Sequence, residues 1–234
     1  MVSFVGHTAA QLNGGRTFPF KFQLAFFCEL LRRTLAEEST RKIFLGGHSV
    51  GAFTCLQLLQ SLSPADASRV AKVFMLFPTI SDIAATPNGR THTPVLRFLR
   101  PVALAIVALV VALPRALQHW VLLKHIGLHP YEVEAAHGLL HVATVGNCLR
   151  MARDEMAQIG ALQVDLVRAH IDCLYFIWGQ RDQWAPMHQL HTLQGLFGEQ
   201  LQYVVAPKEA AHAFVVGGSH LVAPIVYEQM RQFL

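Results

Sequence analysis

A chain of 234 residues is long enough for one α/β domain with a substantial core, and no linker, repeat or low-complexity tract divides the sequence. Apolar residues make up 53% of it and charged residues 15%, whereas charged residues form about 25% of typical soluble domains, so an ordinary core does not account for the apolar excess. The formal net charge of +4 comes from scattered Lys and Arg side chains, which argues against a nucleic-acid groove and fits a weakly basic surface facing a membrane.

The chain alternates short β-rich runs with helical patterns. Five runs predict buried parallel strands, at residues 2–5, 42–46, 71–77, 173–179 and 201–205. Helical periodicity lies between most of them or follows the last, at residues 18–38, 50–62, 187–197 and 221–234. The start, MVSFVGHTAA, has no basic stretch leading into a long apolar run, so it is not a secretory signal and a cytosolic location is expected. The order predicts an α/β fold, a mostly parallel sheet with helices on both faces, in a single domain over residues 1–234.

The stretch FLGGHSVGAF, residues 44–53, places Ser49 between Gly47 and Gly51 in a G-x-S-x-G pattern. A predicted strand precedes it and an amphipathic helix follows, which is the setting of an α/β-hydrolase nucleophile elbow. Only small neighbours fit such a turn, so both glycines are expected to be required there. The alternative is a glycine-rich turn with an incidental serine; a phosphate-binding loop is less fitting because its lysine is missing.

About ninety residues, 78–170, separate two strands and predict an insertion. Its most apolar part, residues 102–113, is too short to cross a bilayer core, which needs roughly 20 residues. Two interpretations stay open: a buried helix in a cap over the pocket, or a segment about 98–123 that dips into a lipid surface. Basic residues and a tryptophan around the apolar run favour the lipid surface: Arg97, Arg100, Arg115, Lys124 and Trp120.

A serine nucleophile needs a base that a third group orients, and this fold expects the chain order Ser, acid, His. Asp182 follows the strand at 173–179, with Asp172 and Asp165 as less well placed alternatives. His212 follows the last strand, and the other candidate bases are His220, His188 and His191. His48, inside the motif, is expected to point away from the nucleophile and to be structural.

These residues predict acyl transfer. Ser49 attacks an ester carbonyl, His212 passes the proton to the departing alcohol, and Asp182 stabilises the imidazolium. The backbone N–H of Val50 supplies half of the oxyanion hole. No cofactor is expected, and no metal site either, because HxxEH and HExxH motifs are absent and the histidines are dispersed.

Residues 73–96, VFMLFPTISDIAATPNGRTHTPVL, resemble the lipid droplet-associated hydrolase family, whose members carry very similar Leu-Phe-Pro-Thr-Ile and Ser-Pro-Asn-Gly-Arg segments. The resemblance extends to LGGHSVGAF, to residues 146–156 and to the regions of Asp182 and His212. It implies a serine esterase acting on lipid esters, with sterol esters as a candidate substrate. It also implies residence on lipid droplets and on the cytosolic side of the endoplasmic reticulum membrane.

The sequence departs from that family pattern at its start, where members have earlier strands and a Gly/Pro-rich loop. The N-terminal strands are therefore expected to be missing, together with the loop that supplies the second oxyanion donor. We expect a longer protein to be the competent enzyme and this form, made alone, to be unstable or weakly active. Two competing functions remain: a non-catalytic lipid-droplet scaffold that keeps the hydrolase fold, and a soluble hydrolase of small esters.

Overall fold

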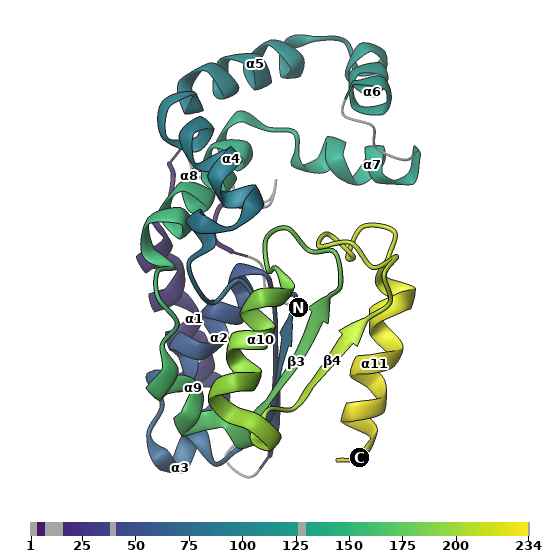
Figure 1. Ribbon diagram of the computed structural model, residues 1–234. Helices are drawn as coiled ribbons and strands as arrows, with labels where there is room; N and C mark the ends of the chain where they lie inside the picture. Colours follow the sequence, from purple (N-terminus) through teal and green to yellow (C-terminus); the bar gives the residue numbers. More distant parts are fainter. Residues whose placement is uncertain (1–3, 8–15, 38–40, 126–129, 234) are drawn as a thin grey trace. The chain divides into compact units, whose positions relative to one another are not determined.

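A computed structural model describes residues 4–7, 16–37, 41–125 and 130–233 (Figure 1). The chain forms two compact units. One combines Met1–Gln23 with Thr91–Glu155, and the other combines Leu24–Arg90 with Met156–Leu234. We call them the helical unit and the sheet unit.

The sheet unit contains four parallel strands: β1 (Ile43–His48), β2 (Val70–Leu76), β3 (Leu174–Gly179) and β4 (Tyr203–Ala206). Their spatial order equals their chain order, β1-β2-β3-β4. Four of the five predicted strands are therefore present, and the predicted α/β fold with a parallel sheet is confirmed. For the fifth, residues 2 and 3 lie outside the described part, and Phe4 and Val5 lie in a turn in which the His7 N–H donates to the Phe4 carbonyl (3.1 Å).

Helices cover both faces of this sheet, and β1 shows how the sequence achieves this. Phe44 packs with a cluster that includes Val222 of α11 (Ser219–Arg231). Ile43 and Leu45 pack against a different cluster, formed by Leu58 of α2 (Val50–Gln60) and by Leu31 and Leu35 of α1 (Phe20–Glu37). Successive side chains of a strand point to opposite faces, so an uninterrupted apolar run buries both. Besides α2, α11 and most of α1, this unit contains α3 (Pro64–Ala67), α9 (Val164–His170), α10 (Met187–Phe197), the start of α4 (Pro87–Phe98) and the end of α8 (Val142–Gln158).

The helical unit holds most of the predicted insertion. It contains the end of α4, α5 (Arg100–Ala112), α6 (Arg115–Lys124), α7 (Pro130–Leu139) and most of α8, together with the first turn of α1. Between β2 and β3, the described residues contain helices and turns and no strand.

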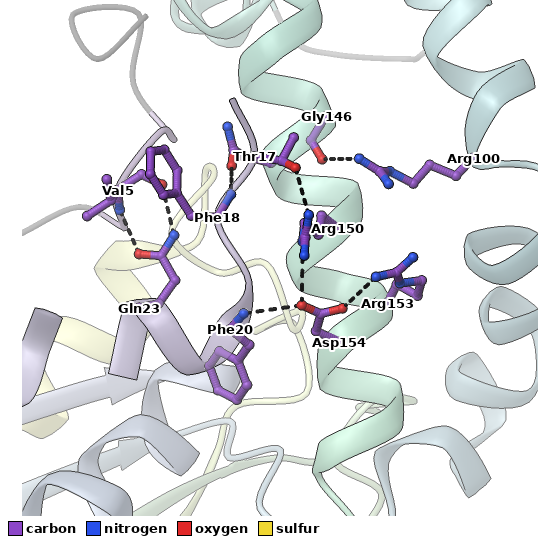
Figure 2. A network of polar contacts seen from close by, with 11 residues as sticks. Val5, Thr17, Phe18, Phe20, Gln23, Arg100, Gly146, Arg150, Arg153 and Asp154 are labelled. Atoms are coloured by element: carbon purple, nitrogen blue, oxygen red, sulfur yellow. Dashed lines mark hydrogen bonds and ion pairs between the residues drawn. The ribbon is translucent and has the colours of Figure 1, made fainter. Parts of the chain in front are cut away.

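A network of polar contacts anchors residues 17–20 to α8 (Figure 2). The Asp154 carboxylate accepts the backbone N–H of Phe20 at 3.2 Å and a bond from Arg153 at 3.0 Å, while Arg150 donates to the Thr17 hydroxyl at 3.0 Å. Phe20 is fully buried and Asp154 is 9% exposed, so the carboxylate satisfies an N–H that water does not reach. This side chain therefore fixes the entry of α1.

Helix α5 has no buried residue, although it contains only apolar side chains after its first residue. Large apolar side chains on and beside it are half or more exposed: Phe98, Leu99, Val102, Ile106 and Leu109. No single helix in the described ranges has the length and hydropathy to cross a membrane. Taken together, α4 and α5 have that length and composition, across a bend of 80°.

Candidate active site

Ser49 occupies the turn between β1 and α2. Its backbone has φ 55° and ψ −122°, a conformation that is strained for a residue with a side chain. The Ser49 N–H donates to the Leu76 carbonyl at the end of β2 (2.9 Å), and its carbonyl accepts the Ala52 N–H in the first turn of α2 (3.0 Å). Hydrogen bonds to the end of β2 and to the first turn of α2 thus hold the strained turn that the G-x-S-x-G pattern predicts.

The two motif glycines differ in what they contribute. A Cβ atom on Gly47 would lie 2.2 Å from the Gly51 carbonyl oxygen and 2.6 Å from the Ala52 nitrogen, so no side chain fits there. A Cβ on Gly51 would meet nothing within 4 Å. The expectation that both glycines are required is therefore wrong for Gly51: it lies in α2, and its missing side chain would point into open space.

Asp182 lies in the loop after β3 and its side chain is fully buried. One carboxylate oxygen accepts the backbone N–H groups of Trp184 (2.7 Å) and Ala185 (3.1 Å). The other oxygen lies 2.6 Å from Nδ1 of His212. Two backbone donors thus fix the carboxylate so that its second oxygen faces the imidazole.

His212 lies between β4 and α11, and its side chain is 19% exposed. Its Nε2 lies 2.9 Å from Oγ of Ser49, while Nδ1 faces Asp182. The structure therefore brings together the three side chains that the sequence singled out. In this order an imidazole can take the proton of the hydroxyl while the carboxylate stabilises the resulting cation.

The alternative candidates make other contacts. Asp165 forms an exposed ion pair with Arg168 at 3.3 Å, and the Asp172 carbonyl accepts a bond from Lys72 at 3.3 Å. His188 lines a separate cavity of about 150 Å³ beside α10. His191 is exposed on α10 and His220 is exposed in the first turn of α11.

Val50 is the first residue of α2, so its N–H directly follows the candidate nucleophile. The first N–H groups of a helix have no partner within the helix and are free to bind a negative charge. Within the described ranges, no three His, Cys, Asp or Glu residues lie together in a way that could hold a metal ion.

His48 makes a contact that the sequence does not predict. Its Nε2 lies 2.7 Å from the backbone carbonyl oxygen of His212. The motif predicts a structural ring that points away from the nucleophile, and nothing in its spacing indicates a partner 164 positions away. Only the folded sheet brings the two residues together.

A model of the lipid-droplet associated hydrolase family matches residues 1–215. The chain belongs to this family. The resemblance drawn from residues 73–96 and the elbow is thereby confirmed. Among curated relatives, a lipid droplet-associated hydrolase of Mus musculus is 29% identical over 189 residues, covering 80% of this chain and 57% of the relative. A protein of the same name from Drosophila melanogaster is 29% identical over 198 residues, covering 82% and 62%. The chain thus spans about three fifths of the length of these relatives.

Solved structures place the fold among the α/β hydrolases. A thermophilic esterase from Thermogutta terrifontis superposes with a TM-score of 0.57 and 18% identity, covering 93% of this chain and 74% of the esterase. An α/β hydrolase from a Medee basin deep-sea metagenome library also gives a TM-score of 0.57, with 13% identity, covering 90% and 71%. At these identities the likeness concerns the fold alone.

Proposed function

We propose that this chain is the catalytic part of a serine hydrolase of lipid esters that acts at a lipid-droplet surface. The observation that carries the proposal is the continuous chain of contacts from the Asp182 carboxylate through His212 to the Ser49 hydroxyl. The bond from Nδ1 to the carboxylate leaves Nε2 as the acceptor of the hydroxyl proton. Ser49 is then the nucleophile, His212 the general base and Asp182 the acid that orients and stabilises the imidazolium.

The proposed reaction has two halves. Ser49 Oγ attacks the ester carbonyl carbon as His212 Nε2 removes its proton, and the imidazolium then protonates the departing alcohol as the C–O bond breaks. The acyl-enzyme remains. A water molecule, deprotonated by His212, attacks the acyl carbon, and the proton returns to Ser49 as the fatty acid leaves.

The carbonyl oxygen carries negative charge in both tetrahedral intermediates. The Val50 N–H, next to the nucleophile and at the start of α2, is the donor that we assign to it. The helix adds to this effect because its N-terminus carries a partial positive charge.

The lipid character of the substrate is proposed from the family and from α5. The relatives are named lipid droplet-associated hydrolases. Val102 (54%), Ile106 (56%) and Leu109 (70%) are exposed along α5, and a contiguous exposed apolar surface of this kind fits a lipid interface. We therefore propose that residues about 98–123 dock on the droplet or on the cytosolic face of the endoplasmic reticulum, and that sterol esters are among the substrates.

Fluorophosphonate labelling tests the chemistry. The probe phosphonylates an activated serine, so the wild-type chain should be labelled, whereas Ser49→Ala and His212→Ala should not. Ser81→Ala is a matched control on a buried serine of the sheet unit and should be labelled normally. Labelling that survives Ser49→Ala would refute the assignment, and an unlabelled wild type with intact droplet binding would favour a scaffold.

Flotation with phospholipid-coated triolein droplets tests the docking surface. Replacing Val102, Ile106 and Leu109 together by Ser should move the protein into the soluble fraction while Ser49 labelling persists. Replacing Val215 and Tyr227, equally exposed apolar residues of the sheet unit, by Ser is the control and should leave flotation unchanged. Unchanged flotation of the α5 variant would contradict the lipid-surface proposal.

A further inference from the structure

The side chain of His48, the residue before Ser49, contacts the backbone of His212. His48 is the last residue of β1, and its Nε2 lies 2.7 Å from the carbonyl oxygen of His212. A carbonyl oxygen only accepts hydrogen bonds, so Nε2 must carry the hydrogen and Nδ1 the lone pair. One tautomer of one side chain thus holds two segments that are distant in the sequence.

Two buried aromatic rings enclose the His48 imidazole. The ring centroid of Phe214 lies 4.9 Å away and that of Phe77 lies 6.3 Å away, both in edge-on arrangements. Phe77 is fully buried and Phe214 is 6% exposed. Burial lowers the pKa of His48 to about 4, and the nearby charge of His212 acts in the same direction. The ring is therefore neutral near pH 7.

The segment that carries His212 packs its apolar side chains Ala210 and Phe214 into a buried cluster with residues of β2 and β3. It runs from the end of β4 to the start of α11 and consists of turns. Its local bonds include one from the Ala210 N–H to the Pro207 carbonyl and one from the Gly218 N–H to the Phe214 carbonyl, each 2.9 Å. A bond from the rigid end of β1 therefore contributes directly to where the His212 backbone lies.

We propose that His48 is a positioning residue: its Nε2–H holds the backbone of His212 so that the imidazole meets Ser49 and Asp182 at once. The catalytic meaning of this bond rests on the proposed function, whereas the bond itself does not. A misplacement of a base by about 1 Å can cost on the order of 100-fold in rate, because proton transfer depends on a short, aligned contact.

A neutral donor suits this position better than a charged one. The rings of His48 and His212 lie 5.1 Å apart, and His212 becomes positively charged in each half of the proposed reaction. A second cation at that distance would oppose the formation of the imidazolium. Lys or Arg can donate the same bond but would add that charge.

The first test compares two variants that differ in the donor. His48→Phe keeps an aromatic ring and loses the N–H, while His48→Gln keeps an amide N–H near the position of Nε2. With p-nitrophenyl butyrate we expect kcat of His48→Phe to fall about 10- to 100-fold with KM within about twofold, and that of His48→Gln to stay within about fivefold of wild type. Equal activity of the Phe variant, or equal losses in both variants, would overturn the proposal.

Two readouts do not depend on catalysis. Hydrogen exchange of residues 207–218 should speed up in His48→Phe and not in His48→Gln. The ¹⁵N shifts of the His48 ring in the wild-type chain at pH 7 should show the Nε2–H tautomer, which decides the matter even where the Phe variant fails to fold. An Nδ1–H tautomer would overturn the positioning role. Absent labelling of wild-type Ser49 would instead overturn the proposed function alone.

Discussion

The Nε2 atom of His212 lies 2.9 Å from Oγ of Ser49, although 163 positions separate the two residues in the chain. The parallel sheet explains this closeness. Ser49 directly follows β1 and His212 lies in the segment after β4, so both belong to the same edge, at the carboxyl ends of the strands. Asp182 follows β3 at that edge and completes the arrangement.

The first prediction concerns the orientation of the imidazole. In Asp182→Asn, the oxygen that accepts from Trp184 and Ala185 can remain, but an amide group replaces the oxygen that faces His212 Nδ1. An amide N–H there favours the wrong tautomer, with the hydrogen on Nε2. We expect kcat for ester hydrolysis to fall by about 10⁴ with little change in KM.

The matched controls are Asp165→Asn and Asp172→Asn, at the two other acids that the sequence offered. Asp165 pairs with Arg168 on the surface, and the contact of Asp172 with Lys72 uses its backbone carbonyl. Both variants should keep kcat within about twofold of wild type. A loss in either control as large as that in Asp182→Asn would contradict the assignment of the acid.

The sequence singles out the three residues of this candidate site because each follows a predicted strand, and short apolar runs predict strands. The partner of His48 could not be predicted from the sequence, since the bond to the His212 carbonyl depends on the path of a segment that consists of turns. The motif predicts a tight fit at Gly51 that the structure does not have, because a sequence pattern does not show which way a Cβ atom would point. The contact of Asp154 with Phe20, 134 positions away, leaves no local pattern either.

The second prediction separates the two motif glycines. In Gly47→Ala, the new Cβ atom would lie 2.2 Å from the Gly51 carbonyl oxygen. The backbone of Gly51 cannot move away from it without distorting the elbow. We expect a loss of about 3 kcal/mol or more in the free energy of unfolding, or insoluble protein. Gly51→Ala meets nothing within 4 Å and replaces glycine inside a helix, so it should be neutral or stabilise by up to about 1 kcal/mol. Urea unfolding of both variants checks this, and equal stabilities would contradict the elbow geometry.

The third prediction concerns the carboxylate at the start of α1. Asp154→Ala removes the carboxylate that accepts the buried N–H of Phe20 and the bond from Arg153. We expect the free energy of unfolding to fall by about 2–4 kcal/mol. Glu29→Ala is the control, because its ion pair with Arg33 is exposed (54% and 70%) and should be worth less than about 0.5 kcal/mol. Similar losses in both variants would contradict the role of the network.

The fourth prediction concerns pH. Burial raises the pKa of the Glu155 carboxyl to about 7, with a smaller contribution from the charge of Asp154. Between about pH 4.5 and 7 the folded chain therefore keeps a proton that the unfolded chain has released, so raising the pH favours unfolding. The contribution of Glu155 is fully present below its unfolded pKa and is lost as the pH rises towards 7, by up to about 1.4 kcal/mol per pH unit.

The variant Glu155→Gln isolates this effect, because glutamine has the same shape and no titration. Its stability relative to wild type should increase steadily from pH 4.5 to 7, while histidines with lowered pKa, such as His48, affect both proteins alike and cancel in the difference. Urea unfolding at half-unit pH steps measures it. A difference that stays constant over this range, or that decreases as the pH rises, would show that the Glu155 carboxyl is ionised in the folded chain, as an exposed side chain would be.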